Sequence, residues 1–343
     1  MEKMISEIRK LYPLVFNPIA APKPWGGAAL TNVLGKHFPG IPENEKIGES
    51  WELADMGEHN TAVSNGWLAG RTLGSLMKEY KERIVGERVY DRYGSQFPLL
   101  IKFLDIEEKL SVQVHPDDRV AAERYGSLGK AEAWYILDAQ PDAKIYMGLG
   151  KDVSQAEFYE ACGKGTADSL LNVIHPAKGD VIFINPGTVH AADGGILVCE
   201  IQESSDITFR LYDWGRELNP ATARQMHLDE AAGLINLKKY DGTGFLKAGP
   251  SPFVTTSLRI VSCPQFNISR ITLHDTVKKD TNGGFIVYCC IKGEVSIRYD
   301  DSDKAGECRL KSGDTCLIPA DMQEFTLVPV KKGSEVLESA AER

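Results

Sequence analysis

The sequence lacks the long apolar segments that membrane insertion or export needs. No apolar run approaches the ~18 residues of a membrane-spanning helix. The N-terminal stretch MEKMISEIRKLYPL carries charges on both sides of Met4 and Ile5, so it also lacks the apolar core of a signal peptide. We therefore expect a cytoplasmic protein that makes no contact with membranes.

An excess of positive charge is also missing. The 343 residues include 48 acidic and 39 basic ones, which gives a formal net charge of −9. Proteins that bind nucleic acid usually present a basic surface, so this balance argues against nucleic acid as a partner. Any anionic ligand has to be held by a local group of basic residues.

Cysteine is scarce, and no two cysteines have the CxxC spacing. An odd set of 7 cysteines in a chain without a secretion signal predicts reduced thiols rather than a disulfide framework. Two glycine-rich segments, Met147–Lys151 and Gly163–Thr166, have neither the length of a phosphate-binding P-loop nor a preceding apolar strand. The chemistry must therefore come from other residues.

What the sequence does contain is a series of short β-type runs bounded by Gly, Pro, Asp and Asn. In the first part of the chain they lie near Val63 and at 97–103, 110–114, 133–137, 181–184, 196–201 and 207–212. Helical periodicity is limited to Thr72–Ile84, Ser154–Ala161 and Thr222–Leu234. This pattern predicts a mainly β fold in which a few helices decorate a sandwich or barrel.

A second strand-rich block follows the turn-rich segment Lys239–Pro252. We therefore predict a first domain at residues 1–240 and a second at 245–343. Each block contains a Gly-Asp turn that leads into an apolar strand ending at proline, at Gly179–Pro186 and at Gly313–Pro319. A duplicated β-barrel explains this repeat economically.

Polar side chains gather on one face of the strand predicted at 110–114. Alternate side chains of a strand point to the same side. One face therefore carries Ser111, Gln113 and His115, and the other carries Val112 and Val114. The first face can bind ligands, whereas the second is apolar.

Two further segments supply metal-binding residue types. Lys130 and Glu132 share one face of the next strand, and His190 follows a strand and a tight Pro-Gly turn that holds it rigidly. Each residue taken alone is more often structural. Together with the Gln113 amide oxygen they suit zinc, with iron, manganese or cobalt as alternatives. No such context surrounds the other histidines, which we expect to be structural or exposed: His37, His59, His175, His227 and His274.

Seven motifs occur in a characteristic order over most of residues 12–215. They are Pro24-Trp-Gly-Gly27, Gly48-Glu-Ser-Trp-Glu52, Pro98-Leu-Leu-Ile-Lys102, Leu110-Ser-Val-Gln-Val-His-Pro116, Gly129-Lys-Ala-Glu132, Asn185-Pro-Gly-Thr-Val-His190 and Ser205-Asp-Ile-Thr-Phe-Arg210. With them the chain resembles the cupin superfamily and, more closely, the type I mannose-6-phosphate isomerases in their short bacterial form. The resemblance implies two cupin-type (jelly-roll) β-barrels and a zinc-dependent conversion of mannose 6-phosphate to fructose 6-phosphate. The family's ligand motif matches Gln113, His115, Glu132 and His190.

The resemblance also implies roles around the metal. The residues implied near the reacting carbons are Lys130, Glu200, Asp206 and Arg210. Arg210 or the metal would face the developing oxyanion. Lys102 and Ser111 match positions that contact the phosphate end of the substrate. The identity of the catalytic base stays open.

Two of these cations lie in apolar runs. Lys102 follows the run at 97–101, and Arg210 lies within the strand predicted at 207–212. Both side chains should therefore face a pocket or a paired carboxylate. Trp25 and Trp51 belong to the motifs, but we expect them to be core aromatics.

The second block has lost the ligand pattern. Asp321 stands where the turn glycine would be, and Glu324 stands where the histidine would be. We expect a degenerate cupin that covers apolar surface of the first barrel or walls its site. A separate sugar or regulatory site in this block is the alternative.

Two other functions are compatible with these motifs. One is a non-catalytic metal-cupin that binds a phosphosugar, and the other is an isomerase of another hexose phosphate. A pure binder has less reason to assemble Lys130, Glu200 and Arg210, so these residues favour an enzyme. The sequence leaves the native metal open and is compatible with a monomer or a homodimer.

Overall fold

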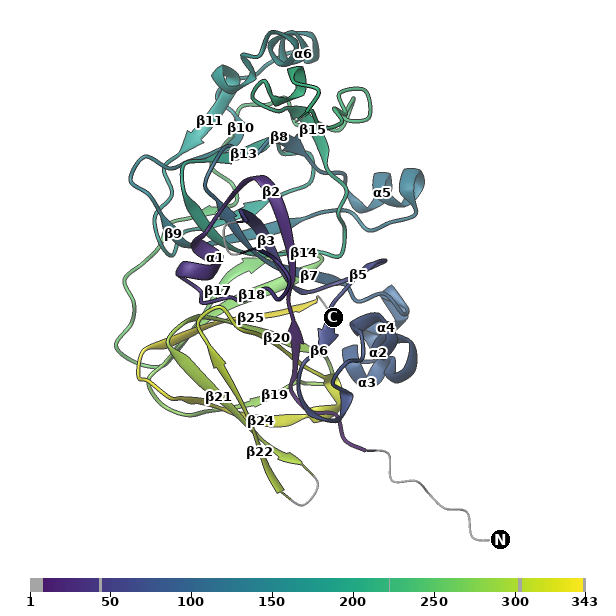
Figure 1. Cartoon of the computed structure of the whole chain (residues 1–343), viewed down its shortest axis with the longest axis vertical. Coiled ribbons are helices and arrows are strands. Elements are labelled where there is room, and N and C mark those ends of the chain that lie inside the picture. Colours follow the sequence, from purple (N-terminus) through teal and green to yellow (C-terminus); the bar gives the residue numbers. More distant parts are fainter. Residues whose placement is uncertain (1–8, 43–44, 222, 302–303, 342–343) are drawn as a thin grey trace. The chain divides into compact units, whose positions relative to one another are not determined.

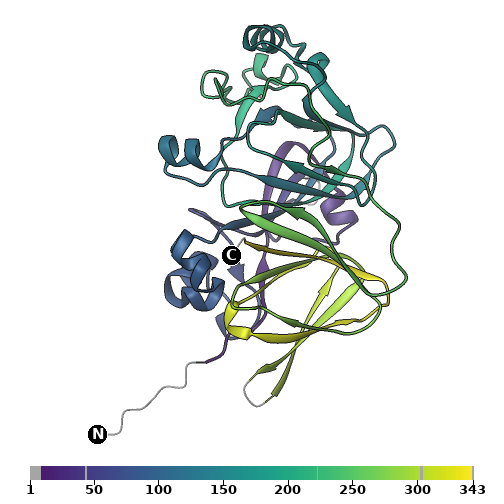
Figure 2. The ribbon, with the colours of Figure 1, turned by 180° about the vertical axis from the view of Figure 1, so that it is seen from behind.

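The computed structural model describes residues 9–42, 45–221, 223–301 and 304–341, and it is mainly β, as predicted (Figure 1 and, from behind, Figure 2). Its contacts divide the chain into two compact units. The central unit comprises Pro18–Thr61 and Pro98–Pro250, and the terminal unit comprises Ala62–Phe97, the described residues up to Asn17 and those from Ser251 onward. No helix among the described residues is long and apolar enough to cross a membrane.

These units differ from the predicted division into 1–240 and 245–343. One boundary, after Pro250, adjoins the turn-rich linker, but the terminal unit also takes in segments from the N-terminal part. Strand pairing explains this, because β1 (Leu14–Asn17) pairs with both β23 (Thr315–Ile318) and β6 (Ala62–Val63). Local sequence patterns do not record which distant strand will be the partner.

The central unit consists of two main antiparallel sheets with helices at their margins. One sheet has the order β16-β12-β9-β14-β7-β3-β2 and the other the order β11-β10-β13-β8-β15. The strands are β2 (Ile19–Gly27), β3 (Ile47–Leu53), β4 (Asp55–Met56), β5 (His59–Asn60), β7 (Leu99–Ile106), β8 (Val112–Val114), β9 (Glu132–Ala139), β10 (Lys144–Leu149), β11 (Leu171–Ile174), β12 (Val181–Ile184), β13 (His190–Asp193), β14 (Ile196–Glu203), β15 (Phe209–Tyr212) and β16 (Phe245–Leu246). The helices are α1 (Ala29–Asn32), α5 (Asp118–Tyr125), α6 (Gln155–Lys164), η2 (Ala167–Leu170) and η3 (Arg216–Leu218).

An apolar core fills the space between these two sheets. Leu104 and Ile136 of the larger sheet belong to one buried cluster with Ile145 and Ala192 of the smaller sheet and with Trp25. The pairings among the described strands do not close either sheet into a barrel. The unit is therefore an open two-sheet form of the predicted architecture.

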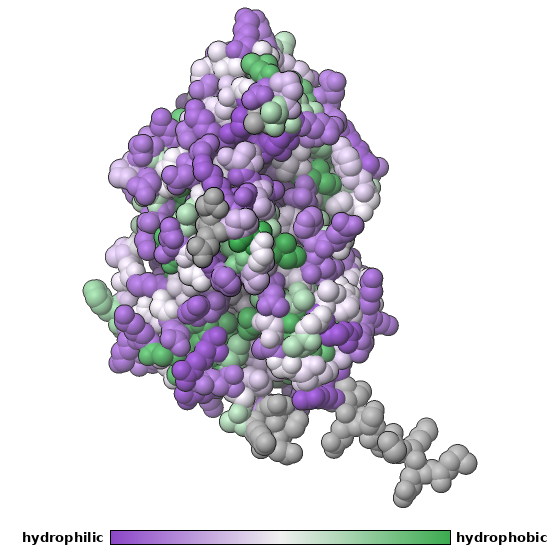
Figure 3. Space-filling view, viewed as in Figure 1, coloured by the Kyte–Doolittle hydropathy of each residue, from purple (hydrophilic) through white to green (hydrophobic). Residues whose placement is uncertain are grey.

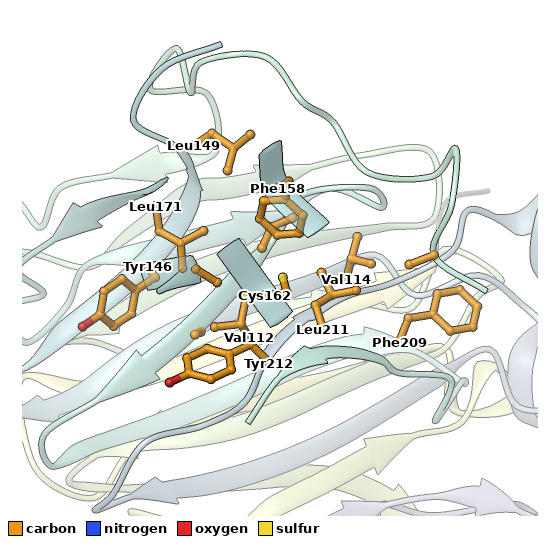
Figure 4. Close-up of a cluster of buried hydrophobic side chains, with 14 of the residues drawn as sticks. Val112, Val114, Tyr146, Leu149, Phe158, Cys162, Leu171, Phe209, Leu211 and Tyr212 are labelled. Atoms are coloured by element: carbon orange, nitrogen blue, oxygen red, sulfur yellow. The ribbon is translucent and has the colours of Figure 1, made fainter. Parts of the chain in front are cut away.

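The smaller sheet has a second buried layer on its other side (Figure 4). Val112 and Val114 of β8 pack there with Phe158 of α6. Because Gln113 lies between the two valines, its side chain points to the opposite side of the sheet. The alternation predicted for 110–114 is confirmed for the apolar face, and the polar face is turned toward the space between the sheets.

The terminal unit repeats the two-sheet plan. Its sheets have the orders β17-β18-β25-β20-β23-β1-β6 and β19-β24-β21-β22, with one shared core that includes Ile271, Tyr288 and Leu327. The further strands are β17 (Thr256–Ser262), β18 (Phe266–Leu273), β19 (Val277–Asp280), β20 (Ile286–Lys292), β21 (Glu294–Asp301), β22 (Lys304–Lys311), β24 (Glu324–Pro329) and β25 (Ser334–Ala341). The helices are η1 (Gly66–Leu68), α2 (Leu73–Tyr80), α3 (Glu82–Val85), α4 (Glu87–Tyr93) and η4 (Ala320–Met322).

The repeated Gly-Asp motif has the same local structure in both units. Gly179 and Gly313 both adopt positive φ, at 90° and 94°, which glycine reaches without the strain of a side chain. Each turn leads into a strand of four residues, β12 in the central unit and β23 in the terminal unit. This similarity supports the interpretation of the fold as a duplication.

The predicted helices are correct in two of three places. Thr72 and Ser154 cap the first turns of α2 and α6 with their side chains. The helix predicted at 222–234 is wrong, because residues 223–227 are irregular and residues 228–234 form turns. His227 uses its backbone N–H to bond the carbonyl of Arg210 in β15 instead of a carbonyl of its own segment. Tertiary contacts have therefore replaced the helical pattern.

Most cysteines lie inside, whereas the face of the protein shown in Figure 3 is mainly polar. All seven cysteines are free thiols, as predicted, and six of them are buried. The face shown in Figure 3 is mostly hydrophilic, and its hydrophobic residues form small separate groups. This distribution is typical of an ordinary folded globular protein.

Candidate metal centre and its pocket

Three side chains with metal-binding atoms meet inside the central unit. His115 follows β8, Glu132 begins β9 and His190 begins β13, and their ligand atoms all lie within 4.8 Å of one another. All three residues are buried, and no other group of this kind occurs among the described residues. The structure thus brings together residues that are far apart in the sequence.

Both imidazoles are oriented through the ring nitrogen that faces away from Glu132. Nδ1 of His115 lies 3.0 Å from the carbonyl oxygen of Ile207, and Nδ1 of His190 lies 2.9 Å from that of Thr188. A carbonyl only accepts, so both Nδ1 atoms carry a proton. Nε2 of His115 and Nε2 of His190 lie 3.4 and 3.2 Å from the Glu132 carboxylate. Such backbone contacts orient metal-binding histidines in general.

The Glu132 carboxylate supplies the clearest indication of a cation. Both of its oxygens are buried and accept no hydrogen bond from any described residue. Lys130 lies 3.0 Å from Oε2 in an ionic contact, which balances the charge without replacing the lost hydration. Burial opposes ionisation, but the charge of Lys130 holds the pKa of Glu132 well below its usual value. An anionic, unsolvated carboxylate between two imidazoles fits a divalent metal ion.

His115 is also in the protonation state that binds metal. Burial, reinforced by the charge of Lys130, lowers the pKa of His115 to about 3. Its imidazole is therefore neutral at physiological pH. Lys130 reaches into the same space, because its Nζ lies 3.1 Å from Nε2 of His115.

Gln113 completes the set of ligand types. Its Nε2 lies 3.2 Å from Nε2 of His190, and the Ser111 hydroxyl donates to its Oε1 at 3.3 Å. The two ends of a carboxamide have the same shape, so a half-turn of the amide would exchange them. The oxygen would then face the centre, and Ser111 would accept from the amide nitrogen.

A cavity of about 210 Å³ adjoins this centre. It is lined by Gln113 and Lys130 and by the remaining residues that the sequence singled out: Lys102, Ser111, Glu200, Asp206 and Arg210. The walls come from β7, β8, β14 and β15 and from the loops beside them. The fold thus gathers all these residues around one space.

Lys102 is paired with carboxylates, as its position in an apolar run predicted. Its Nζ lies 3.8 Å from Glu49 and 3.6 Å from Glu200, and 4.6 Å from the centre of the Trp51 ring. Burial disfavours its charge, but the two carboxylates outweigh this effect and raise the pKa of Lys102. Trp134 donates to the other oxygen of Glu200 at 2.8 Å and so fixes that carboxylate.

Arg210 is anchored at one end of its guanidinium group. Nη1 donates to the carbonyl of Gln225 at 2.8 Å, whereas the buried Nε has no partner among the described residues. Burial and the nearby Arg224 lower the pKa of Arg210. This wall of the cavity is therefore electropositive and suited to an anionic group.

Comparisons with known proteins agree with this geometry. The family model for the type I phosphomannose isomerase catalytic domain matches residues 15–143, and that for the mannose-6-phosphate isomerase cupin domain matches residues 254–332. The chain is 33% identical over 320 residues to mannose-6-phosphate isomerase ManA of Bacillus subtilis, covering 92% of this chain and 95% of that protein. It is 32% identical over 316 residues to the putative mannose-6-phosphate isomerase YvyI of the same organism, with the same coverage. The chain belongs to the type I mannose-6-phosphate isomerase family.

The resemblance inferred from the motifs is thereby confirmed. The crystal structure of the mannose 6-phosphate isomerase from B. subtilis superposes with a TM-score of 0.79 at 29% identity, covering 96% of this chain and 99% of that one. A putative mannosephosphate isomerase from Archaeoglobus fulgidus has the same fold, with a TM-score of 0.76 at 20% identity over 98% of this chain and all of its own. The mainly β, cupin-type fold class predicted from the sequence is therefore confirmed.

The pocket of this family member also contains residues that sequence reasoning missed. Glu49, Arg224 and His227 line it, and Trp25, expected only in the core, does so as well. Glu49 could have been found, because it belongs to the Gly48-Glu-Ser-Trp-Glu52 motif and a carboxylate buried in a strand needs a partner. Arg224 and His227 lie in the segment mistaken for a helix. The fully buried Asp213 holds Arg224 there by accepting from its Nε at 2.9 Å.

Glu200 should make the stability of the metal-free protein depend on pH. Burial, together with the charge of Glu132, raises the pKa of Glu200 to about 7. The unfolded chain loses this proton near pH ~4.3. Between these values the folded state holds the extra proton, so the stability that Glu200 contributes is complete at low pH and is lost as pH rises to 7.

The measurement is urea denaturation of the metal-free wild type and Glu200→Gln at pH 5, 6 and 7. The wild type should lose stability relative to the variant as pH rises, by at most about 1.4 kcal/mol per pH unit for one proton. Glu157→Gln is the control, because Lys151 lowers the pKa of this exposed carboxyl and it stays ionised throughout. A wild-type to Glu200→Gln difference that is constant over this range would contradict the assignment.

Proposed function

We propose that the chain interconverts mannose 6-phosphate and fructose 6-phosphate and holds one zinc ion for this reaction. The observation that carries the proposal is the buried Glu132 carboxylate, which accepts no hydrogen bond from any described residue and lies between the imidazoles of His115 and His190. The relatives that cover nearly all of this chain bear the name mannose-6-phosphate isomerase.

His115, Glu132 and His190 would hold the ion, with the Gln113 oxygen as a fourth ligand. When bound, the ion supplies Lewis-acid stabilisation of negative charge on a substrate oxygen. The histidines are held for this purpose by backbone carbonyls, and Lys130 keeps a positive charge within 3.0 Å of the carboxylate.

Isomerisation requires ring opening, transfer of a proton between C2 and C1, and stabilisation of an enediolate oxygen. In this proposal Lys130 and Arg210 offer positive charge to that oxygen, since both line the cavity. Glu200 and Asp206 are carboxylates of the same cavity that can move protons. Glu200 is well suited to proton transfer, because its pKa of about 7 is close to the pH at which the enzyme would work.

The phosphate end of the substrate is assigned to Lys102 and Ser111. Their ammonium and hydroxyl groups line the cavity and are suitable donors to a phosphate dianion. Lys102 already faces Glu49 and Glu200, so the phosphate has to share this cation with two carboxylates. We further propose that the enzyme works in the cytoplasm as a monomer or homodimer and has no nucleic-acid or membrane partner.

The test is a coupled assay of mannose 6-phosphate turnover by the purified protein. Activity should disappear after chelator treatment and return with zinc. Manganese and cobalt, added separately to the chelated protein, test whether zinc is the preferred ion. Tight binding of one metal ion without turnover would instead support a phosphosugar-binding cupin. If the protein converts a different hexose phosphate from a substrate panel instead, the isomerase chemistry is supported and mannose 6-phosphate is rejected as its substrate.

A further inference from the structure

A second polar cavity lies within the terminal unit. It has a volume of about 290 Å³ and is lined by side chains of β17, β18, β19, β20 and β25. Its main polar lining consists of Arg259, Asn267, Ser269, Lys279, Asn282 and Glu338. None of these residues belongs to the candidate metal centre.

The cavity begins where the core-facing side of one sheet changes from apolar to polar. Four residues are successive partners across β17, β18, β25 and β20: Arg259, Ser269, Glu338 and Tyr288. The next core-facing row along the strands contains Ile271, Val336 and Cys290, all of them in the apolar core. Side chains two positions apart point the same way, so Ser269, Glu338 and Tyr288 face the same interior. Arg259 extends this row at the exposed edge strand β17.

The polar row is connected to the other sheet of the unit. The Tyr288 hydroxyl donates to Oε2 of Glu338 at 2.6 Å, and the Lys279 ammonium of β19 lies 2.6 Å from the same oxygen. Nε of Arg259 donates to the Ser269 hydroxyl at 3.1 Å. Both polar partners of Glu338 bind Oε2, so Oε1 is left as an acceptor for a ligand.

Core packing does not explain these groups. Replacing a buried ion pair with well-packed apolar side chains often leaves the stability of a protein unchanged or increases it. The side chains of Lys279 and Glu338 keep 21% and 19% of their surface exposed, so solutes can reach them. Polar groups held in place beside a cavity and open to solvent are typical of a binding site.

We propose that this cavity binds a phosphorylated monosaccharide. The exposed guanidinium of Arg259 would hold the phosphate, and Asn267, Ser269 and Glu338 would bind sugar hydroxyls. Asp280 also lines the cavity, and it accepts from the backbone N–H of Asn282.

The charges and the size of the cavity set the ligand class. Arg259 and Lys279 are balanced by Asp280 and Glu338, so a ligand with one charged end and several neutral hydroxyls fits better than a compact polyanion. The cavity is at the lower end of the roughly 300–1,000 Å³ of small-molecule sites, which favours a monosaccharide over a nucleotide.

The experiment is isothermal titration of the metal-loaded full chain. The titrant is an equilibrated mixture of mannose 6-phosphate and fructose 6-phosphate, so that turnover adds no net heat. We expect two sites per chain, one at the metal centre and one in the terminal unit. Arg259→Ala and Glu338→Gln should each weaken the second site at least tenfold, whereas Arg309→Ala, an exposed change in the same unit, should leave both sites unchanged.

Three outcomes would overturn the proposal. The first is a single site that neither variant affects, and this result would leave the proposed isomerase function intact. The second is equal affinity for inorganic phosphate, which would mean an anion site without sugar recognition. The third is equal affinity for unphosphorylated mannose. A single site that is lost in Arg259→Ala would instead support this proposal and contradict substrate binding at the metal centre. Because Arg259 is exposed, its replacement leaves the core intact.

Discussion

Replacing Glu132 with glutamine is expected to remove metal binding and turnover together. The variant keeps the shape of the side chain but lacks the anion that has to join the two imidazoles in binding a divalent ion. Replacing a residue that hydrogen-bonds to a metal ligand typically lowers metal affinity roughly 10- to 100-fold. Replacing the ligand Glu132 itself should lower it by more. Metal content by elemental analysis and kcat in the coupled assay measure both effects on the same sample.

A buried carboxylate elsewhere serves as the control for this substitution. Glu335 in the terminal unit is 4% exposed and pairs with Lys292 at 3.1 Å. Glu335→Gln should keep both metal and turnover, even if its stability falls. If Glu132→Gln bound one metal ion per chain as tightly as the wild type, the ion would have to be held elsewhere and the candidate centre would be rejected.

The largest loss of stability is expected from Lys102→Met. Methionine keeps the apolar stem but removes the ammonium that faces Glu49 and Glu200 in the buried wall of the pocket. Removing one partner from a buried ion pair typically lowers the free energy of unfolding by about 3–5 kcal/mol, because the remaining charge is unsolvated. Urea denaturation of the metal-free proteins measures this loss.

Two further variants separate charge burial from a general effect of losing lysine. Lys46 pairs with Glu108 on the surface, where both side chains are more than half exposed, so Lys46→Met should leave stability unchanged within error. Adding Glu49→Gln to Lys102→Met should recover part of the lost stability. A Lys102→Met protein as stable as the wild type would show that the two carboxylates do not depend on this cation.

The metal centre could be anticipated because it depends on local periodicity. Alternation along 110–114 placed Gln113 and His115 on one face, and the structure puts the two valines of this segment into an apolar cluster on the other. Glu132 and His190 are the first residues of β9 and β13, so the direction of each strand sets the side of the sheet to which their side chains point. Strand alternation is a short-range property of the chain, so sequence reasoning reaches it.

The far wall of the pocket could not be anticipated in this way. Arg224 and His227 lie in a segment whose apolar spacing suggested a helix, but its residues bond to β15 and to Asp213. The choice between a helix and these contacts depends on side chains that only the folded sheet brings near. Propensity over a short segment is too weak to decide against such contacts.

The sequence by itself determined the strand-rich class, the ligand types and the family, because periodicity, residue chemistry and ordered motifs are all written along the chain. Only the tertiary structure decided that β1 and residues 62–97 join the terminal unit, that Glu49 and Glu200 are the carboxylates facing Lys102, and that a polar row interrupts the core of that unit. Each of these facts depends on which distant strands pair. Partner choice is a collective result of burying all apolar faces at once, and no single segment encodes it.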